Sequence, residues 1–211
     1  MLNEQPSCFG SRVAIGAYQN DGTTGDANDN RGHVRIYDYN GSAWVQVGTD
    51  IDGEAANDRS GYSVSLSSDG SRVAIGATGN DGTASNAGHV RIYEYSNSSW
   101  NKLGTDIDGE AGDDFSGTSV SLSSDGSRVA IGATGNDGNG NSSGHVRIYD
   151  YNGSAWNKLG TDIDGEAAGD YSGGSVSLSA DGSRVAIGAS SNSNGNGIYS
   201  GHVRIYELKF E

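Results

Sequence analysis

One segment recurs along the chain at a fixed interval, and this repetition restricts the fold more than any other feature. The segment Ser-Arg-Val-Ala-Ile-Gly-Ala begins at Ser11, Ser71, Ser127 and Ser183. The last three copies start 56 residues apart, and the first copy carries a longer loop. Such a period indicates repeats that each form one small structural unit. We expect a single domain over residues 1–211, with copies at about 1–59, 60–115, 116–171 and 172–211.

Each copy has the alternating pattern of β-strands rather than the spacing of helices. In the second copy we expect strands at 63–67, 72–77, 89–95 and from 100 to about 107. Short turns separate the first pair and the last pair, as in hairpins. Four antiparallel strands per copy predict an all-β fold, a β-propeller with four repeats of about 56 residues.

The two ends of the chain fall inside a repeat. The first copy has no clear inner strand unless residues 1–8 supply an irregular one, and the last copy lacks its outer strand. Unfinished sheets leave unpaired edges. Two arrangements would cover them: a closed four-bladed ring within one chain, or half of a larger ring completed by a homo-oligomer. The sequence leaves both open.

Composition limits the partners of the chain. Its 35 glycines and 33% hydrophobic residues rule out a thick aliphatic core. A net charge of −14 argues against nucleic acid, which binds through clustered Lys and Arg. We also expect no membrane insertion and no disulfide, because no apolar segment is long enough and Cys8 is the only cysteine.

Long loops gather on one face of the expected propeller. Antiparallel order places the loops at 18–31, 78–87, 134–143 and 190–200 beside those at 52–60, 108–116 and 164–172. Long loops on a rigid scaffold commonly carry binding sites. We therefore place the ligand surface on this face.

Acidic residues cluster in the loops between repeats, in an order that would offer oxygen ligands to a cation such as Ca²⁺. The candidate ligands are Asp52, Glu54, Asp58, Asp108, Glu110, Asp114, Asp164, Glu166 and Asp170. The alternative is that these side chains cap turns and solvate the rim. Ca²⁺ is the one cofactor that the sequence suggests.

Two further groups are candidates for ligand contact on the long-loop face. The first is the aspartate of three Asn-Asp-Gly segments, Asp21, Asp81 and Asp137, although this segment is foremost a turn former. The second is a set of aromatic residues, Tyr62, Phe115 and Tyr171, for which burial between blades is the alternative. Glycan binding would require an aromatic of this kind.

Histidine opens the third strand in every copy, at His33, His89, His145 and His202. A residue needed for packing recurs in every repeat, whereas a catalytic residue is needed once. We therefore expect these histidines to be structural. The chain also lacks the common motifs of nucleophilic, metallopeptidase and phosphate-binding sites, so we expect no catalytic residues.

Residues 115–120, Phe-Ser-Gly-Thr-Ser-Val, continuing to Ala130-Ile131-Gly132-Ala133, resemble the FG-GAP repeat of the integrin α-subunit propeller and related surface proteins. The resemblance implies a propeller at the cell surface or outside the cell, here as part of a longer chain because no signal peptide is present. Two features differ. The loop that holds Ca²⁺ in that family is only Ser-Ser-Asp-Gly-Ser here, and four repeats are fewer than the family's seven.

These observations predict a non-enzymatic binding or adhesion module that presents its long acidic loops to a protein or a glycan. A lectin-like propeller with repeated glycan sites is the alternative, and a hydrolase using paired acids is the third hypothesis.

Overall fold

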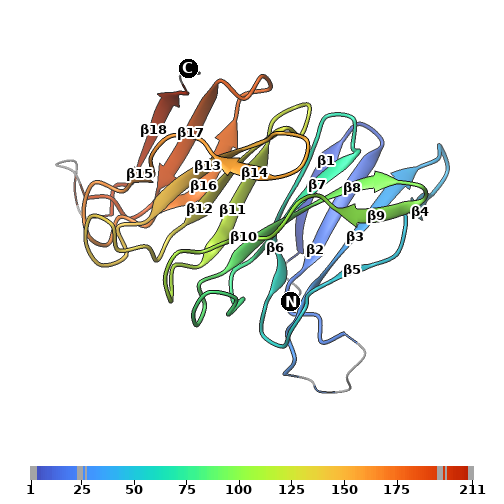
Figure 1. Ribbon diagram of the computed structural model, residues 1–211, viewed down its shortest axis with the longest axis horizontal. Helices are drawn as coiled ribbons and strands as arrows, with labels where there is room; N and C mark the ends of the chain where they lie inside the picture. The colour runs from blue at the N-terminus through green and yellow to red at the C-terminus, as the bar shows by residue number, and fades with distance from the viewer. Residues whose placement is uncertain (1–3, 23–25, 27, 194–196, 198, 209–211) are drawn as a thin grey trace.

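The computed structural model describes residues 4–22, 26, 28–193, 197 and 199–208. Within these ranges the ordered elements are β-strands, and no helix could cross a membrane. The strands form four antiparallel sheets that follow one another along the chain (Figure 1). The expected all-β architecture of repeated blades is confirmed, and we number the sheets as blades 1 to 4.

The blades have the following strands. Blade 1 contains β1 (Glu4–Phe9), β2 (Arg12–Ala17), β3 (His33–Tyr39), β4 (Trp44–Gln46) and β5 (Ile51–Asp52). Blade 2 contains β6 (Ser60–Leu66), β7 (Arg72–Ala77), β8 (His89–Ser96), β9 (Ser99–Lys102) and β10 (Ile107–Asp108). Blade 3 contains β11 (Ser116–Leu122), β12 (Arg128–Ala133), β13 (His145–Tyr151), β14 (Trp156–Lys158) and β15 (Ile163–Asp164). Blade 4 contains β16 (Ser172–Leu178), β17 (Arg184–Ala189) and β18 (His202–Glu207).

The hydrophobic core lies between the blades rather than inside any one of them. Val34 and Ile36 of blade 1 belong to the same buried cluster as Val73 and Ile75 of blade 2. Equivalent clusters join blades 2 and 3 and blades 3 and 4. Alternation along each strand sends one set of side chains to the preceding blade and the other to the following blade. Small residues such as Ala74 allow the sheets to approach closely.

The fourth strand of each complete blade is broken, contrary to the continuous strand expected at 100–107. In blade 2 it consists of β9 and β10, which both pair with β8. Gly104 lies between them with a φ of +78°, in the left-handed region. A Cβ atom at Gly104 would stand 3.0 Å from Cδ1 of Trp156 in the next blade. The break therefore makes room for an inter-blade tryptophan.

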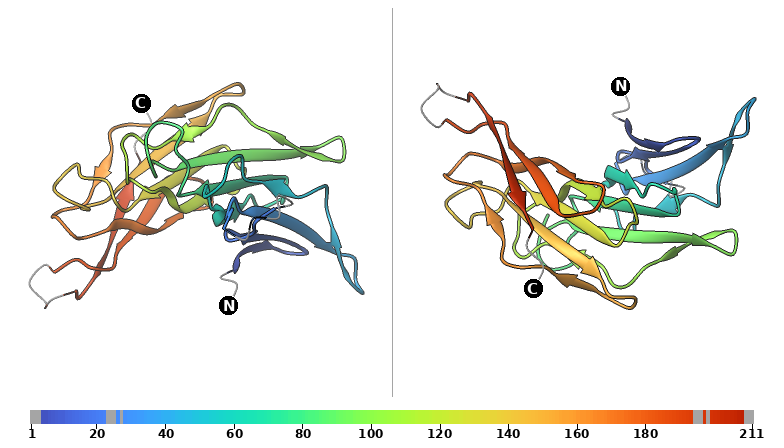
Figure 2. Two further views of the ribbon diagram at one scale, coloured as in Figure 1. Left: turned by 90° about the horizontal axis from the view of Figure 1, so that it is seen from below. Right: turned by 90° about the horizontal axis from the view of Figure 1, so that it is seen from above.

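The blades form an arc with two free ends. Their inner strands neighbour one another in the order β1, β6, β11 and β16. Blade 1 and blade 4 lie at opposite ends of the molecule (Figures 1 and 2). Residues 4–9 do supply an inner strand, since β1 pairs with β2 along its whole length. Over the part of the chain that is described, the ring does not close.

Candidate functional site

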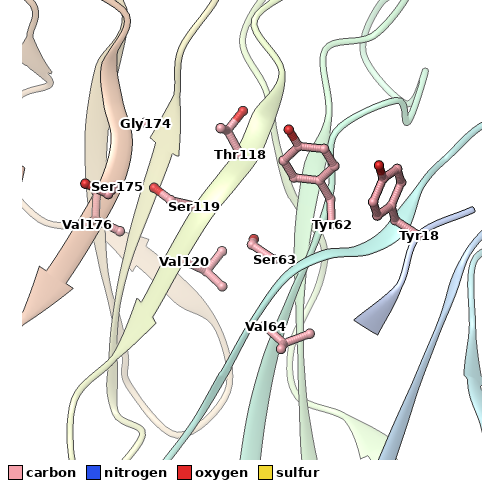
Figure 3. Close-up of a pocket in the computed structure, with 10 residues that line it drawn as sticks. All are labelled: Tyr18, Tyr62, Ser63, Val64, Thr118, Ser119, Val120, Gly174, Ser175 and Val176. Carbon is pink, nitrogen blue, oxygen red and sulfur yellow. The ribbon is translucent and has the colours of Figure 1, made fainter. Parts of the chain in front are cut away.

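The inner strands border a groove of about 400 Å³ (Figure 3). Its rim carries the rings of Tyr18 and Tyr62, whose centroids lie 5.3 Å apart at an angle of 58°. The other lining residues are Ser63, Val64, Thr118, Ser119, Val120, Gly174, Ser175 and Val176. Each of three successive inner strands thus contributes a serine followed by a valine.

This groove offers hydroxyl groups and no acid. Ser63 Oγ donates to the Gly117 carbonyl, and Ser119 Oγ donates to the Gly173 carbonyl, each at 2.7 Å. The two hydroxyls therefore link neighbouring blades. None of the residues that line the groove carries a carboxylate. The lining thus provides no pair of acids for the hydrolase hypothesis.

A second kind of site recurs where the blades meet. In blade 2 the guanidinium of Arg91 lies 3.1 Å from the carboxylate of Glu54, which reaches over from the loop that follows β5. Arg91 Nε also donates to Nε2 of His89 at 3.1 Å. The ion pair recurs between Arg147 and Glu110 at 3.4 Å and between Arg204 and Glu166 at 3.8 Å.

Three groups of histidine and acidic side chains place their ligand atoms within 4.8 Å of one another. They are His33 with Asp50 and Asp52, Glu54 with His89 and Asp106, and Glu110 with His145 and Asp162. An arginine lies within each group and forms an ion pair with one of its acids. Protein cations therefore already neutralise part of the negative charge, and Ca²⁺ binding stays a prediction of the sequence.

The structure separates the nine predicted metal ligands by role. Asp58, Asp114 and Asp170 are buried, with 2%, 3% and 4% of their surface exposed. Asp114 accepts from the backbone N–H of Ala111 at 3.0 Å and from the amide of Asn136 at 3.3 Å. These three aspartates therefore tie the loop between blades to the next long loop. The glutamates pair with arginines, and Asp52, Asp108 and Asp164 end the short strands β5, β10 and β15.

The predicted contact residues of the long loops also lie apart from one another. Oδ1 of Asp21 accepts from the backbone of Asn30, and Asp81 and Asp137 make the equivalent bond to Asn86 and Ser142. The aspartates thus shape their own loops. Parts of the loops at 18–31 and 190–200 lie outside the described residues.

The three aromatic candidates do not occupy equivalent positions. Phe115 and Tyr171 have φ values of +54° and +52°, and the residue that matches them in the preceding repeat is Arg59, at +57°. Tyr171 is 44% exposed, whereas Phe115 is partly buried. Tyr62 lies three residues further along, in the groove near the axis. The chain therefore presents no ring of equivalent aromatics.

Blade 1 differs from the others, because in the described part of the chain no glutamate from a preceding blade faces its arginine. A pocket of about 200 Å³ opens there, which we call the His33 pocket. It is lined by Asn20, Gly22, Arg31, His33, Arg35, Asp50 and Asp52. Arg35 is 44% exposed, whereas the side chains of Arg91 and Arg147 are 7% and 5% exposed.

Local structure positions the charged groups of the His33 pocket. Arg31 binds Asp29 through Nε at 3.1 Å and through a terminal nitrogen at 2.9 Å. Its side chain runs over Gly22, where a Cβ atom would stand 2.8 Å from Arg31 Cδ. Arg35 donates to Asp50 at 3.0 and 2.9 Å. Two guanidinium groups, those of Arg31 and Arg35, therefore line the pocket together with the His33 imidazole.

The electrostatics of the pocket keep His33 neutral at pH 7. Burial, followed by the positive charge of Arg35, lowers the pKa of His33 below its usual 6.5. The Arg35 hydrogen bonds lower the pKa of Asp50, so this carboxylate stays ionised. Nδ1 of His33 lies 3.8 Å from Asp50 Oδ2. A neutral imidazole beside a carboxylate can accept a proton from water.

Sequence comparison supports the repeat. The FG-GAP repeat family matches residues 102–149, which confirms the resemblance over that segment. These residues run from the end of β9 into β13 and contain the whole of β11 and β12. No curated protein matches the chain.

Two solved structures resemble the whole arc. One, from Bacteroides uniformis, is described as a putative 6-phosphogluconolactonase and has 10% sequence identity and a TM-score of 0.61. The other, from Bacteroides fragilis, carries the same description, with 12% identity and a TM-score of 0.60. Both cover 97% of this chain, which spans about half of their length, 50% and 51%. At this identity the likeness shows the fold.

These neighbours correct the functional expectation. Both are described as enzymes, which contradicts the prediction of a non-enzymatic binding or adhesion module and counts equally against its lectin-like alternative. The prediction of no catalytic activity was based on the repetition of each side chain in every blade. Repetition in sequence does not make the surroundings of the copies alike, because the side chain of Arg35 beside His33 is 44% exposed, whereas those of Arg91 and Arg147 are 7% and 5% exposed.

Proposed function

We propose that the chain is a propeller hydrolase that opens a lactone of an acidic sugar in the His33 pocket. The observation that carries the proposal is the juxtaposition in one open pocket of a neutral imidazole and two guanidiniums, Arg31 and Arg35. The likeness of the arc to two structures described as 6-phosphogluconolactonases supports this class of reaction.

His33 would act as the general base. A water molecule loses a proton to the imidazole while its oxygen attacks the lactone carbonyl carbon. The tetrahedral intermediate then collapses, the ring C–O bond breaks, and the proton returns from the imidazolium to the leaving oxygen. Asp50, 3.8 Å from Nδ1, favours the imidazolium that forms between the two steps.

The guanidiniums would bind the substrate and stabilise negative charge. Arg35 extends along the wall of Asp50 and is exposed enough to reach a ligand oxygen. Arg31, from the long loop of blade 1, lines the same pocket. Guanidinium groups recognise phosphate and carboxylate with paired N–H donors. They would confer a preference for a phosphorylated over a neutral lactone, despite the acidic character of the whole chain.

The proposal is tested by following acid release from 6-phosphoglucono-δ-lactone and from glucono-δ-lactone in a pH-stat. We expect turnover above the spontaneous rate, greater for the phosphorylated substrate. His33→Gln should lower kcat by about 10²- to 10⁴-fold, the usual contribution of a general base. The matched control is His202→Gln, the same position in blade 4, which should keep the wild-type rate. A rate equal to the spontaneous one, or equal losses in both variants, would refute the proposal.

A further inference from the structure

The outer face of blade 4 exposes apolar side chains that every other blade buries. Val203 and Ile205 on β18 are 67% and 72% exposed. In blades 1 to 3 the equivalent valines are fully buried, and the equivalent isoleucines are at most 2% exposed: Val34, Val90 and Val146, and Ile36, Ile92 and Ile148. The following blade covers those side chains. Blade 4 thus presents the first half of an interface that the molecule forms three times.

Blade 1 presents the second half. Val13 and Ile15 on β2 are partly exposed, whereas their equivalents Val73 and Ile75 in blade 2 are 0% and 2% exposed. Trp44 is 52% exposed, while Trp100 packs against the core of the preceding blade. The two ends of the arc therefore expose complementary surfaces, and the intervening blades show how such surfaces pack.

Polar groups at the two ends are complementary in the same way. In blades 1 to 3 an arginine donates to a glycine carbonyl in the turn of the following blade, as Arg12 does to Gly70 at 2.8 Å and Arg128 to Gly182 at 2.7 Å. Among the described residues no blade packs beyond Arg184 of blade 4, and its side chain is 65% exposed. The equivalent turn of blade 1 contains Gly10, which is exposed.

A second hydrogen bond between blades follows the same rule. Ser65 and Ser121 accept through Oγ from the backbone N–H groups of Leu122 and Leu178, both at 3.0 Å. The next member of this series is Ser177, which is exposed on β16. The backbone of Cys8 in blade 1 occupies the position that Leu66 occupies in blade 2. Cys8 pairs with Val13, and Leu66 pairs with Val73, which is the equivalent of Val13.

We propose that a second copy of this chain docks its blade 1 on the exposed face of blade 4, and that two copies close one ring. The contact continues the packing already present between successive blades. The arc spans about half the length of the two solved propeller chains, 50% and 51%, so two arcs supply the length of one. A head-to-tail interface of this kind closes when its rotation completes a circle. The proposal does not depend on catalysis at His33.

The net charge of the chain makes docking depend on ionic strength. Each copy carries −14, so two copies repel one another at low ionic strength, and salt screens that repulsion. Docking should therefore strengthen as salt is added, as expected of an apolar interface between acidic surfaces.

The test is the mass in solution, measured by light scattering after gel filtration over a range of protein and salt concentrations. We expect twice the chain mass of 21.7 kDa at high concentration. The double variant Val203→Asp and Ile205→Asp should be monomeric, as should Val13→Asp and Ile15→Asp. A mixture of the two should recover a dimer, because the first variant retains an intact blade 1 face and the second an intact blade 4 face.

Two further variants separate loss of docking from loss of folding. Arg184→Glu changes an exposed side chain and should weaken dimerisation by about tenfold or more without altering the circular dichroism spectrum. Val45→Asp, at a 50% exposed position on β4, should leave the mass unchanged. A wild-type chain that stays at 21.7 kDa under all conditions, an open-ended polymer, or a dimer unaffected by Arg184→Glu would overturn the proposal.

Discussion

The carboxylate of Glu54 lies 3.1 Å from the guanidinium of Arg91, although Glu54 belongs to the loop after β5 and Arg91 to the middle strand of the next blade. The arginine side chain is 7% exposed and the glutamate 50%. This ion pair links one blade to the next. Glu54 occupies the position that, among the described residues, is open beside Arg35 in blade 1. The ion pair thus explains the cohesion of the arc and the greater exposure of Arg35 in the His33 pocket.

Glu54→Gln should destabilise the fold, because it leaves the buried charge of Arg91 without its acidic partner. Since Glu54 is half exposed, we expect a loss of about 1–2 kcal/mol in the free energy of unfolding, less than for a fully buried pair. Urea denaturation measures it. The control is Glu207→Gln. Glu207 lies 3.7 Å from Arg184, whose side chain is 65% exposed, so this substitution should change the free energy of unfolding by less than about 0.5 kcal/mol. Equal losses would contradict the inter-blade role.

Gly104→Ala should destabilise more than Gly160→Ala. Both glycines have positive φ, +78° and +68°, and each substitution carries a backbone cost of about 1 kcal/mol. Only at Gly104 would the new Cβ also meet Trp156, at 3.0 Å, whereas a Cβ at Gly160 would have no atom within 4 Å beyond its chain neighbours. We expect a further loss of about 1–2 kcal/mol at Gly104, measured by urea denaturation. Equal values would show that the tryptophan adapts without cost.

Acid should weaken the fold before the carboxylates are protonated. Burial, followed by the charge of Arg91, lowers the pKa of His89 from 6.5 to about 4. As pH falls from 6.5 towards 4, the unfolded chain binds a proton that the folded chain does not, so the free energy of unfolding decreases. The loss approaches roughly 3 kcal/mol if the whole shift is expressed.

Urea midpoints at pH 7.5 and 4.5 measure this effect. His89→Gln removes the titrating group and should reduce the difference between the two midpoints. His145 and His33 keep their own share, since burial also lowers their pKa values. A wild-type difference that persists unchanged in His89→Gln would exclude His89 as its source.

Ca²⁺ should have little effect on thermal stability. The glutamates among the predicted ligands pair with arginines, and the buried Asp58, Asp114 and Asp170 accept hydrogen bonds from backbone and asparagine groups. We expect no change in Tm between EDTA and millimolar Ca²⁺, measured by calorimetry with Mg²⁺ as the control. A rise specific to Ca²⁺, lost in Asp108→Asn, would instead support the sequence-based metal site.

Local patterns predicted most of the strands. The segment at 72–77 is β7 itself, and the one expected at 89–95 is β8 less its last residue. Alternation of apolar and small residues sufficed there. The broken outer strand was not predictable in the same way, because its cause, the packing of Trp156 on Gly104, joins two different repeats.

The candidate site was harder to predict for the same reason. His33 repeats in every copy, so the sequence alone treats it as a packing residue. Within the described residues no glutamate faces Arg35, whereas Glu54, Glu110 and Glu166 face the equivalent arginines once the chain has folded. The sequence does contain the relevant pattern, a glutamate in one repeat and an arginine in the next. Stacking of the blades brings these two residues into contact.

The pH dependence of lactone hydrolysis tests the central claim most directly. Because the pKa of His33 is lowered below 6.5, kcat/KM for 6-phosphoglucono-δ-lactone should rise with pH through a midpoint under 6.5. In His33→Gln the enzyme-dependent rate and its midpoint should both disappear, while His202→Gln retains them. A profile that does not differ between the wild type and His33→Gln would contradict the account.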